Sequence, residues 1–271
     1  MAIDWELPFG PETPEEIPLP DNQLVEVIAQ VRFPVVASIA RQEFLGPFQE
    51  RVRAEYPILR QEHETGLLIL PDGVATQRAS TSIWRMANAD SSWTVSVAPG
   101  FIALQTKAYQ RRTDFFARLR RVLTAFEEEV QPGLFDRLGV RYVNRFVGEP
   151  WLKDLTKYIR KEALGLAQLN FASDQAVIAQ YVAYAQFLIN DAALLVRTAY
   201  LPPNATVDPS VAPISDASWL LDLDMSTTPT APGKFDSAQL SALGEEHAAH
   251  IYRFFRWAIT PELIKRAGGQ V

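Results

Sequence analysis

The stretch from Leu24 to Phe33, with the sequence LVEVIAQVRF, indicates the fold class of this chain. Its apolar residues occupy every second position and are Val25, Val27, Ala29, Val31 and Phe33. The positions between them include Glu26, Gln30 and Arg32. A period of two is typical of a β-strand that buries one face and leaves the other polar. We therefore expect a sheet that is covered on one side.

A short helix and a run of strands are predicted after this stretch. The helix opens at Gly46-Pro47 and ends before Pro57, because Phe48, Val52 and Tyr56 lie four residues apart on one stripe. Strands are predicted at residues 67–70, 76–86, 93–98 and 101–108, separated by Pro71-Asp72-Gly73, Asn88-Ala89-Asp90 and Pro99-Gly100. Such tight connections predict an antiparallel meander.

A long helix is predicted next, with Thr113 as its N-cap and Pro132-Gly133 after its end. The second half of the sequence repeats this order of elements. The predicted elements are a strand at 138–147, a helix at 151–164, strands at 177–189, 193–200 and 219–225, and a helix at 237–258.

We therefore predict an α+β fold: an antiparallel sheet with helices on one face, in two repeated β-α-β-α halves.

The predicted organisation has three parts. Residues 1–21 form an extended proline-rich arm, residues 22–135 the first repeat and residues 136–271 the second. A proline-rich loop near residues 202–218 is interpreted as an insertion in the second repeat. In the arm, Trp5, Leu7 and Phe9 alternate. The arm is expected either to pack along its own domain or to be exchanged with a partner subunit.

The internal repeat is supported by equivalent positions near the ends of the two long helices. Val122, Phe126, Val130, Pro132 and Leu134 correspond to Ile251, Phe255, Ile259, Pro261 and Leu263, and each pair is separated by 129 residues. Two units of this kind resemble, in the order of their elements, the TATA-binding-protein-like and helix-grip-like saddle folds.

Composition limits the classes of function. The 271 residues carry a formal net charge of -6, which disfavours a long phosphate-binding surface. No cysteine is present, so disulfides and cysteine-ligated zinc are excluded. The beginning of the sequence has no apolar signal region, and no stretch is apolar enough for a membrane span. We expect a cytoplasmic protein that does not bind a membrane, and nucleic-acid binding is disfavoured except at a local basic patch.

The strand around residues 137–146 carries the first set of candidate site residues. Arg137, Arg141 and Arg145 are four residues apart and share one strand face, with Asn144 on the other. Guanidinium groups in such a row could bind carboxylates or phosphates. Alternatively, they pair with acidic residues of neighbouring strands such as Glu26. If the strand that carries Asp222 and Asp224 is a neighbour, its carboxylates would neutralise these arginines.

The start of the long helix at 113–130 carries the second set, a basic cluster that includes Arg111, Arg112, Arg118 and Arg121. The same helix ends in Glu127-Glu128-Glu129, so its charges oppose the helix dipole. The cluster is expected to be a partner or nucleic-acid surface, a charge-pairing surface, or a solvated helix face.

Metal chemistry and catalysis find little support in the sequence. His247 and His250 lack the spacing and the third ligand of a zinc helix, and His247 falls on the apolar stripe. Asp222 and Asp224 share one strand face and could hold a hard cation, or could face solvent. We expect no catalytic residues, no metal and no cofactor.

Several segments together resemble a sporadically distributed bacterial family of uncharacterised proteins of about this length. They are Leu19-Pro20-Asp21-Asn22, Arg137-Leu138-Gly139-Val140-Arg141-Tyr142-Val143-Asn144-Arg145 and Ile259-Thr260-Pro261-Glu262-Leu263. The patchy distribution of this family is similar to that of defence and toxin–antitoxin genes.

Three functional hypotheses follow. The first is a non-catalytic interaction protein, such as an antitoxin, an immunity protein or a defence-associated accessory subunit, whose partner is another protein or a second copy. The second is a small-molecule binder or enzyme that uses the concave sheet face for an anionic ligand. The third is nucleic-acid binding through the arginine-rich helix.

Overall fold

The structure is a computed structural model that describes residues 8–9, 14–64, 67–69, 75–77, 81–169, 176–208 and 210–270. Trp5 and Leu7 of the predicted arm and the predicted turn Pro71-Asp72-Gly73 lie outside the described residues. Within the described ranges, no helix combines the length and the apolar character that crossing a lipid bilayer requires.

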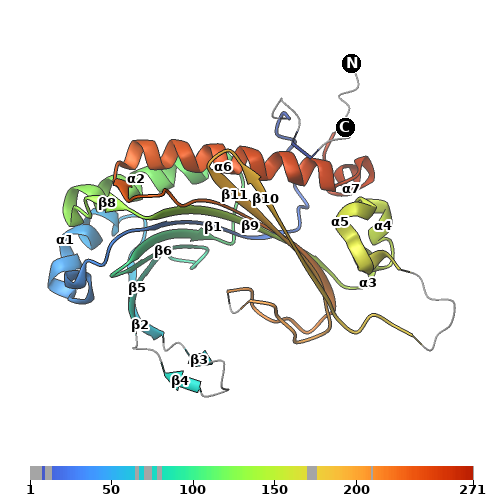
Figure 1. Ribbon diagram of the computed structural model, residues 1–271, viewed down its shortest axis with the longest axis horizontal. Coiled ribbons are helices and arrows are strands. Elements are labelled where there is room, and N and C mark those ends of the chain that lie inside the picture. The colour runs from blue at the N-terminus through green and yellow to red at the C-terminus, as the bar shows by residue number, and fades with distance from the viewer. Residues whose placement is uncertain are drawn as a thin grey trace. The chain divides into compact units, whose positions relative to one another are not determined.

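The described strands confirm the predicted α+β class, with a large antiparallel sheet against which helices pack (Figure 1). Nine strands follow one another across this sheet in the order β10 (Tyr181–Ile189), β11 (Ala192–Leu201), β12 (Ser218–Thr227), β9 (Arg137–Val147), β1 (Leu24–Arg32), β7 (Phe101–Thr106), β6 (Trp93–Ala98), β5 (Thr81–Ala87) and β2 (Ile58–Glu64). Two short ribbons pair β13 (Gly233–Lys234) with β8 (Leu134–Phe135) and β3 (Leu67–Ile69) with β4 (Ala75–Gln77).

The helices differ widely in length. The long ones are α1 (Gln42–Val52), α2 (Arg112–Val130) and α6 (Ser237–Ala258). The short ones are η1 (Ala37–Ala40), α3 (Glu149–Leu152), α4 (Leu155–Tyr158), α5 (Lys161–Leu164), η2 (Gly165–Gln168) and α7 (Pro261–Arg266).

The chain divides into two compact units, each assembled from segments that are far apart in the sequence. Unit 1 contains Met1–Val25, Arg141–Met225 and Glu246–Val271. Unit 2 contains Glu26–Val140 and Ser226–Glu245. The two sequence repeats at 22–135 and 136–271 stay a prediction.

In unit 2, one face of the sheet packs against α1 and α2. Val27, Ala29 and Val31 of β1 are fully buried, as their alternation predicts. The ring centroid of Phe126 in α2 lies 5.3 Å from that of Phe33 and 5.4 Å from that of Phe48 in α1. The alternating apolar residues of β1 and the apolar stripes of α1 and α2 therefore pack together in one core that is rich in aromatic rings.

In unit 1, aromatic rings join the sheet to the short helices, to α6 and to the arm. Phe146 of β9 lies 5.5 Å from Trp151 of α3, between ring centroids. Phe187 of β10 lies 5.8 Å from Phe254 of α6 and 5.3 Å from Phe9 of the arm. Phe9 of the arm therefore packs against unit 1 of its own chain. Exchange of the arm with a partner subunit stays a prediction.

The predicted helix at 151–164 is wrong, because the segment forms three short helices. Between them, the backbone N–H of Arg160 donates to the carbonyl of Ala258 (2.8 Å), and Tyr158 accepts from the N–H of Thr260 (3.0 Å). Ile159 also forms an isolated β-bridge with Ile259. These contacts with the end of α6 hold residues 158–160 in an extended conformation, although the local spacing of apolar residues favours a helix there.

Four other features differ from the predictions. β2 was not predicted, and neither was α7, whose first turn is capped by Thr260 through a hydrogen bond from the N–H of Leu263 (3.3 Å). The predicted strand at 76–86 is two strands, β4 and β5. Thr113 is not an N-cap, because α2 begins at Arg112.

Candidate functional sites

One face of the unit 1 strands carries the charged residues of β9, β11 and β12, and we call it the loop face. Arg141 and Arg145 of β9 contact Asp222 and Ser218 of β12 there. The described residues of the connection between β11 and β12, 202–208 and 210–217, lie over these side chains. Apolar contacts fix this connection, because Val211 joins a buried cluster with Val143, Ala199, Leu201 and Leu220.

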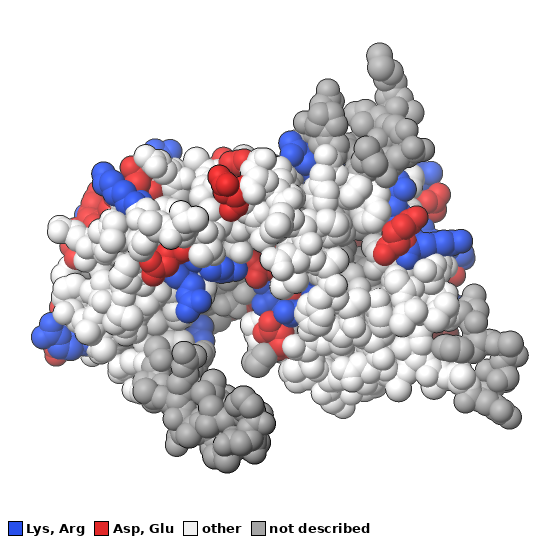
Figure 2. Space-filling model, viewed as in Figure 1, with Lys and Arg blue, Asp and Glu red and all other residues white. Residues whose placement is uncertain are grey.

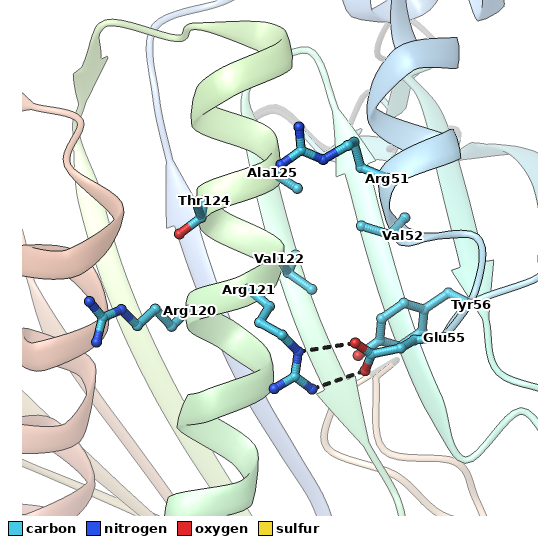
Figure 3. A pocket seen from close by; sticks show the side chains of 9 residues that line it. All are labelled: Arg51, Val52, Glu55, Tyr56, Arg120, Arg121, Val122, Thr124 and Ala125. Atoms are coloured by element: carbon cyan, nitrogen blue, oxygen red, sulfur yellow. Dashed lines mark hydrogen bonds and ion pairs between the residues drawn. The ribbon is translucent and has the colours of Figure 1, made fainter.

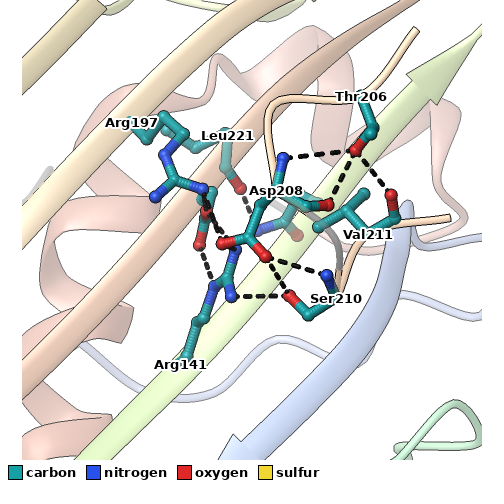
Figure 4. A network of polar contacts seen from close by, with 9 residues as sticks. Arg141, Arg197, Thr206, Asp208, Ser210, Val211 and Leu221 are labelled. Atoms are coloured by element: carbon teal, nitrogen blue, oxygen red, sulfur yellow. Dashed lines mark hydrogen bonds and ion pairs between the residues drawn. The ribbon is translucent and has the colours of Figure 1, made fainter. Parts of the chain in front are cut away.

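Arg141 is held by two carboxylates and a hydroxyl (Figure 4). Its Nε and Nη2 donate to the two carboxylate oxygens of Asp222 at 2.8 and 2.7 Å. Its Nη1 donates to Ser210 Oγ at 2.9 Å, and Asp208 Oδ2 lies 3.2 Å from its Nη2. The condition set for this pairing is met, since β12 lies beside β9. Asp222 is buried against Arg141, so the alternative that it faces solvent is wrong.

Arg197 of β11 completes the cluster that we call the buried ion cluster: Arg141, Arg197, Asp208 and Asp222. Its Nη1 lies 3.2 Å from Asp208 Oδ2 and 3.1 Å from Asp222 Oδ2. The side chains of Arg141, Arg197 and Asp222 are only 14%, 15% and 4% exposed. Each arginine therefore contacts both carboxylates in a partly dry setting, where charge pairing is strong.

The environment sets the charge of Asp208. Burial alone would raise the pKa of this carboxyl group, but hydrogen bonds from the N–H and hydroxyl of Ser210, both 2.8 Å long, favour the ionised form. Arg141 and Arg197 act in the same direction, so the pKa of Asp208 is about 2. The carboxylate that fastens the loop to the sheet is therefore ionised at any physiological pH.

No carboxylate of the described residues contacts Arg145. Its Nε donates to Ser218 Oγ at 3.0 Å and its Nη1 to the carbonyl of Ala212 at 2.6 Å. Its Nη2 is buried and donates to no group of the described chain. Burial lowers the pKa of Arg145.

The other two predicted ligand residues lie elsewhere. Arg137 belongs to unit 2, where its guanidinium lies against Gly139. Asn144 donates to the carbonyl of Leu221 at 3.3 Å. By alternation along β9 it points to the opposite face from Arg141 and Arg145. Of the four predicted residues, the loop face brings together only Arg141 and Arg145.

A groove of about 370 Å³ in unit 2 lies between α1 and α2 (Figure 3). Its walls carry Arg51, Glu55, Arg120 and Arg121 around an apolar floor that includes Val122. Glu55 Oε1 and Oε2 accept from Nε and Nη2 of Arg121, both at 3.0 Å. Arg51 Nη1 donates to Glu129 at 3.2 Å and its Nη2 to Glu128. These ion pairs link the two helices across the groove.

The predicted basic surface is partly engaged in this pairing. Arg118 contacts Asp114 and Glu55, both at 3.3 Å, and its guanidinium carbon lies 4.5 Å from the ring centroid of Trp93. Arg121 pairs with Glu55, as described above, whereas Arg111 is an exposed residue at the start of α2, followed by the half-buried Arg112.

The segment from Leu166 to Leu188 concentrates exposed apolar side chains. Exposed fractions within it are 58% for Leu166, 50% for Leu169, 79% for Val177, 59% for Tyr184 and 80% for Leu188. Between residues 176 and 196 the only charged residue is Asp191, and Figure 2 shows a broad surface without Lys, Arg, Asp or Glu over β10 and β11. We call the exposed side of β10, with Tyr184 and Leu188, the apolar edge.

The histidines of α6 have protein partners. His247 is buried, at 1% exposure. His250 Nδ1 lies 3.2 Å from Arg253 Nη1, and burial followed by this arginine lowers the pKa of His250. Among the described residues, no group of three or more His, Cys, Asp or Glu side chains is arranged to hold a metal ion.

Sequence reasoning missed Arg197, Asp208, Ser210 and the apolar edge. A single arginine in the apolar run LLVRTAYL was a usable signal for Arg197, since a charge at a strand position needs a partner. Asp208 and Ser210 gave no such signal, because only the fold of the loop brings them to the strands.

In comparisons with protein-family models and with curated proteins, nothing matched this chain. The resemblance to the sporadically distributed bacterial family therefore stays a prediction.

Proposed function

We propose that this protein is a binding protein that holds a protein partner along β10, as an antitoxin, immunity or defence-associated accessory subunit does. The observation that supports the proposal is the apolar edge. β10 is the first strand in the sheet order, so among the described strands it has one neighbour, β11. An edge strand directs one set of backbone N–H and C=O groups away from its sheet, where a strand of a partner can pair.

The side chains of β10 fit this role. Natural edge strands are usually protected by charges, prolines or bulges, which discourage pairing with other chains. β10 reads YVAYAQFLI and contains none of these charges or prolines. Leu188 and Tyr184 offer apolar area to a partner, and large apolar residues of this kind supply most of the binding energy in protein interfaces.

The test is a retention experiment with the products of neighbouring genes. The tagged chain would be co-expressed with each candidate and purified, in parallel with a Leu188→Lys variant. We expect the wild type to retain a partner and the variant to lose at least tenfold in affinity, because a lysine at this position must be desolvated in the interface. Leu188 is exposed, so the fold should be unaffected.

A matched control lies at the other edge of the sheet. His63→Lys on β2 also adds one positive charge to an exposed edge-strand side chain, and it should leave retention unchanged. Sedimentation at several concentrations identifies a second copy of this chain as the partner. Equal retention by Leu188→Lys and wild type would contradict the proposal, as would a wild type that sediments as a monomer and retains nothing.

Binding of an anionic ligand on the loop face is a second candidate function. What favours it is that Arg145, unlike Arg141, contacts only a hydroxyl and a carbonyl among the described residues. Nucleic-acid binding through α2 is the weakest of the three hypotheses. Arg118 and Arg121 already pair with Glu55, and a phosphate would have to displace that carboxylate.

A further inference from the structure

The sheet of unit 2 carries polar side chains on the face opposite to its helices. The ring centroid of Trp93 in β6 lies 5.9 Å from that of Phe115 in α2, so Trp93 faces the helices. Because successive residues of a strand alternate, Thr94 points to the opposite face. Gln105 of β7 is the cross-strand partner of Thr94 and shares that face.

A cavity of about 180 Å³ opens on this polar face. Its walls contain two cationic groups, three hydroxyl groups and one amide, and none of the lining residues is acidic. They are Arg85, Ser91, Ser92, Thr94, Gln105 and Lys107. A water molecule takes up about 30 Å³ in the liquid, so the cavity has room for a small ligand.

Two of the lining side chains are held in place by groups behind them. Arg85 donates from Nη1 to the hydroxyl of Ser96, its partner on β6, at 3.0 Å, and from Nε to Glu62 at 2.6 Å. Gln105 donates from Nε2 to the carboxylate of Glu26, a buried residue. Side chains that are fixed before a ligand arrives lose less entropy when they bind it.

The turn between β5 and β6 fixes the mouth of the cavity. The N–H and the hydroxyl of Ser92 donate to Asp90 Oδ1 at 3.0 and 2.6 Å, and the hydroxyl accepts from Asn88 Nδ2 at 3.1 Å. The backbone N–H of Lys107 donates to the carbonyl of Ser92 at 2.9 Å. These bonds hold Lys107 beside the turn, whereas Asp90 does not line the cavity.

The charges of the cavity walls do not cancel. Glu62 compensates Arg85, whose side chain is 29% exposed. Among the described residues, the ammonium group of Lys107 has no carboxylate partner and the hydroxyl of Thr94 has no hydrogen-bond partner. One positive charge therefore remains beside a hydroxyl donor, in a cavity whose other polar groups are already oriented.

We infer that this cavity binds a small molecule through an oxyanion, a carboxylate or a phosphate group. Lys107 supplies the uncompensated charge and Arg85 a second cation, while Thr94 and Ser91 offer hydroxyl donors. The site lies in unit 2, so the inference goes beyond the proposed function and is independent of partner binding at β10.

The experiment is a set of thermal unfolding curves of the full chain in phosphate, acetate and chloride at matched ionic strength and pH. The phosphate and acetate arms distinguish a tetrahedral from a planar oxyanion. A ligand that binds only the folded state stabilises it. For a chain of this size, each tenfold rise of the bound anion above its dissociation constant should raise the melting temperature by roughly 3–5 °C. Chloride should not reproduce this rise.

Three variants test the assignment to this cavity. Lys107→Gln removes the uncompensated charge from an exposed side chain and should abolish the rise. Lys107→Arg keeps the charge and should retain most of it. Thr94→Val replaces the hydroxyl by a methyl group of similar size, and isothermal titration calorimetry should show a several-fold loss of affinity without a change of net charge.

Lys153→Gln is the matched control, because Lys153 is an exposed lysine of unit 1 and its loss changes the net charge equally. It should keep the full rise. An equal loss in Lys153→Gln and Lys107→Gln would show that net charge, not the cavity, attracts the anion. A wild type that responds to neither oxyanion, or responds to chloride as strongly, would overturn the inference. So would an undiminished rise in Lys107→Gln.

Discussion

The buried ion cluster of unit 1 and the ion pairs between α1 and α2 of unit 2 are built from the same kinds of groups and differ in burial. In unit 1, Asp222 is 4% exposed at its side chain and contacts Arg141 and Arg197. In unit 2, Glu55 is 40% exposed and contacts Arg118 and Arg121. Each acidic residue therefore bridges two arginines with similar distances.

The difference in burial indicates which ion pairs contribute to the stability of this fold. Exposed ion pairs contribute little, because water and salt screen them and because long side chains lose entropy when they pair. In a buried cluster, removal of one partner leaves an uncompensated charge away from water. We therefore expect contact geometry to be a poor guide to stability here and burial to be a good one.

The largest expected effect is that of Asp222→Asn. It removes a negative charge from beneath two buried arginines and should lower the free energy of unfolding by about 3–5 kcal/mol. Urea denaturation would measure it. Combination with Arg141→Met should recover part of the loss, because the unpaired cation is removed as well. A loss below about 1 kcal/mol would mean that water reaches the cluster.

Asp208→Asn should have the next largest effect, about 1.5–3 kcal/mol at neutral pH, because it weakens charge-assisted bonds to two arginines. The folded state lowers the pKa of Asp208 from 3.8 to about 2, so the stabilisation is complete above the unfolded value. It is lost as the pH falls from about 4 towards 2. Urea denaturation of the wild type and of Asp208→Asn across this pH range should show the difference between their free energies of unfolding shrink. A difference that stays constant with pH would contradict the lowered pKa of Asp208.

Arg118→Ala should cost about 1 kcal/mol, since it removes packing over Trp93 as well as two exposed ion pairs. The side chain of Arg118 is 29% exposed, a value between the 4% of Asp222 and the 40% of Glu55. Tryptophan fluorescence should report the change around Trp93, and urea denaturation its cost. Arg118→Leu, which keeps most of the apolar contact, should recover part of the loss if packing is the larger contribution.

Glu55→Gln should have the smallest effect, below about 1 kcal/mol in low salt. In about 1 M sodium chloride, Glu55→Gln and the wild type should have the same free energy of unfolding, because the screening length falls to about 3 Å. The loss in Asp222→Asn should persist at the same salt concentration. If both variants responded to salt alike, the contrast in burial would not be what separates the two clusters.

Much of the fold was predictable because its signals are local. The alternation in β1 and the stripes of α2 and α6 correspond to observed elements within a few residues. β2 escaped prediction because its residues Arg60 to His63 are all polar, as suits an exposed edge strand. The helix predicted at 151–164 failed because the bridge between Ile159 and Ile259 is made by residues one hundred positions apart.

The candidate sites were predictable only where a strand period sufficed. Arg141 and Arg145 were singled out by their spacing, and Asp222 was expected to neutralise them if its strand was adjacent. That Arg145 faces Ser218 instead of a carboxylate depends on register, which the sequence does not reveal. Asp208 reaches the sheet through a loop whose path is determined by the packing of Val211.

The discontinuous make-up of the units determines when this protein can fold during its own synthesis. Unit 2 needs residues 226–245, and the ribbon between β13 and β8 joins Lys234 to Leu134. Unit 1 needs Glu246–Val271, including the partners of Tyr158 and Ile159. Neither unit is therefore complete until residues 226 to 271 have been synthesised, so β10 emerges long before α6, which packs on it. A chaperone or a bound partner at the ribosome exit would have its greatest effect on that strand.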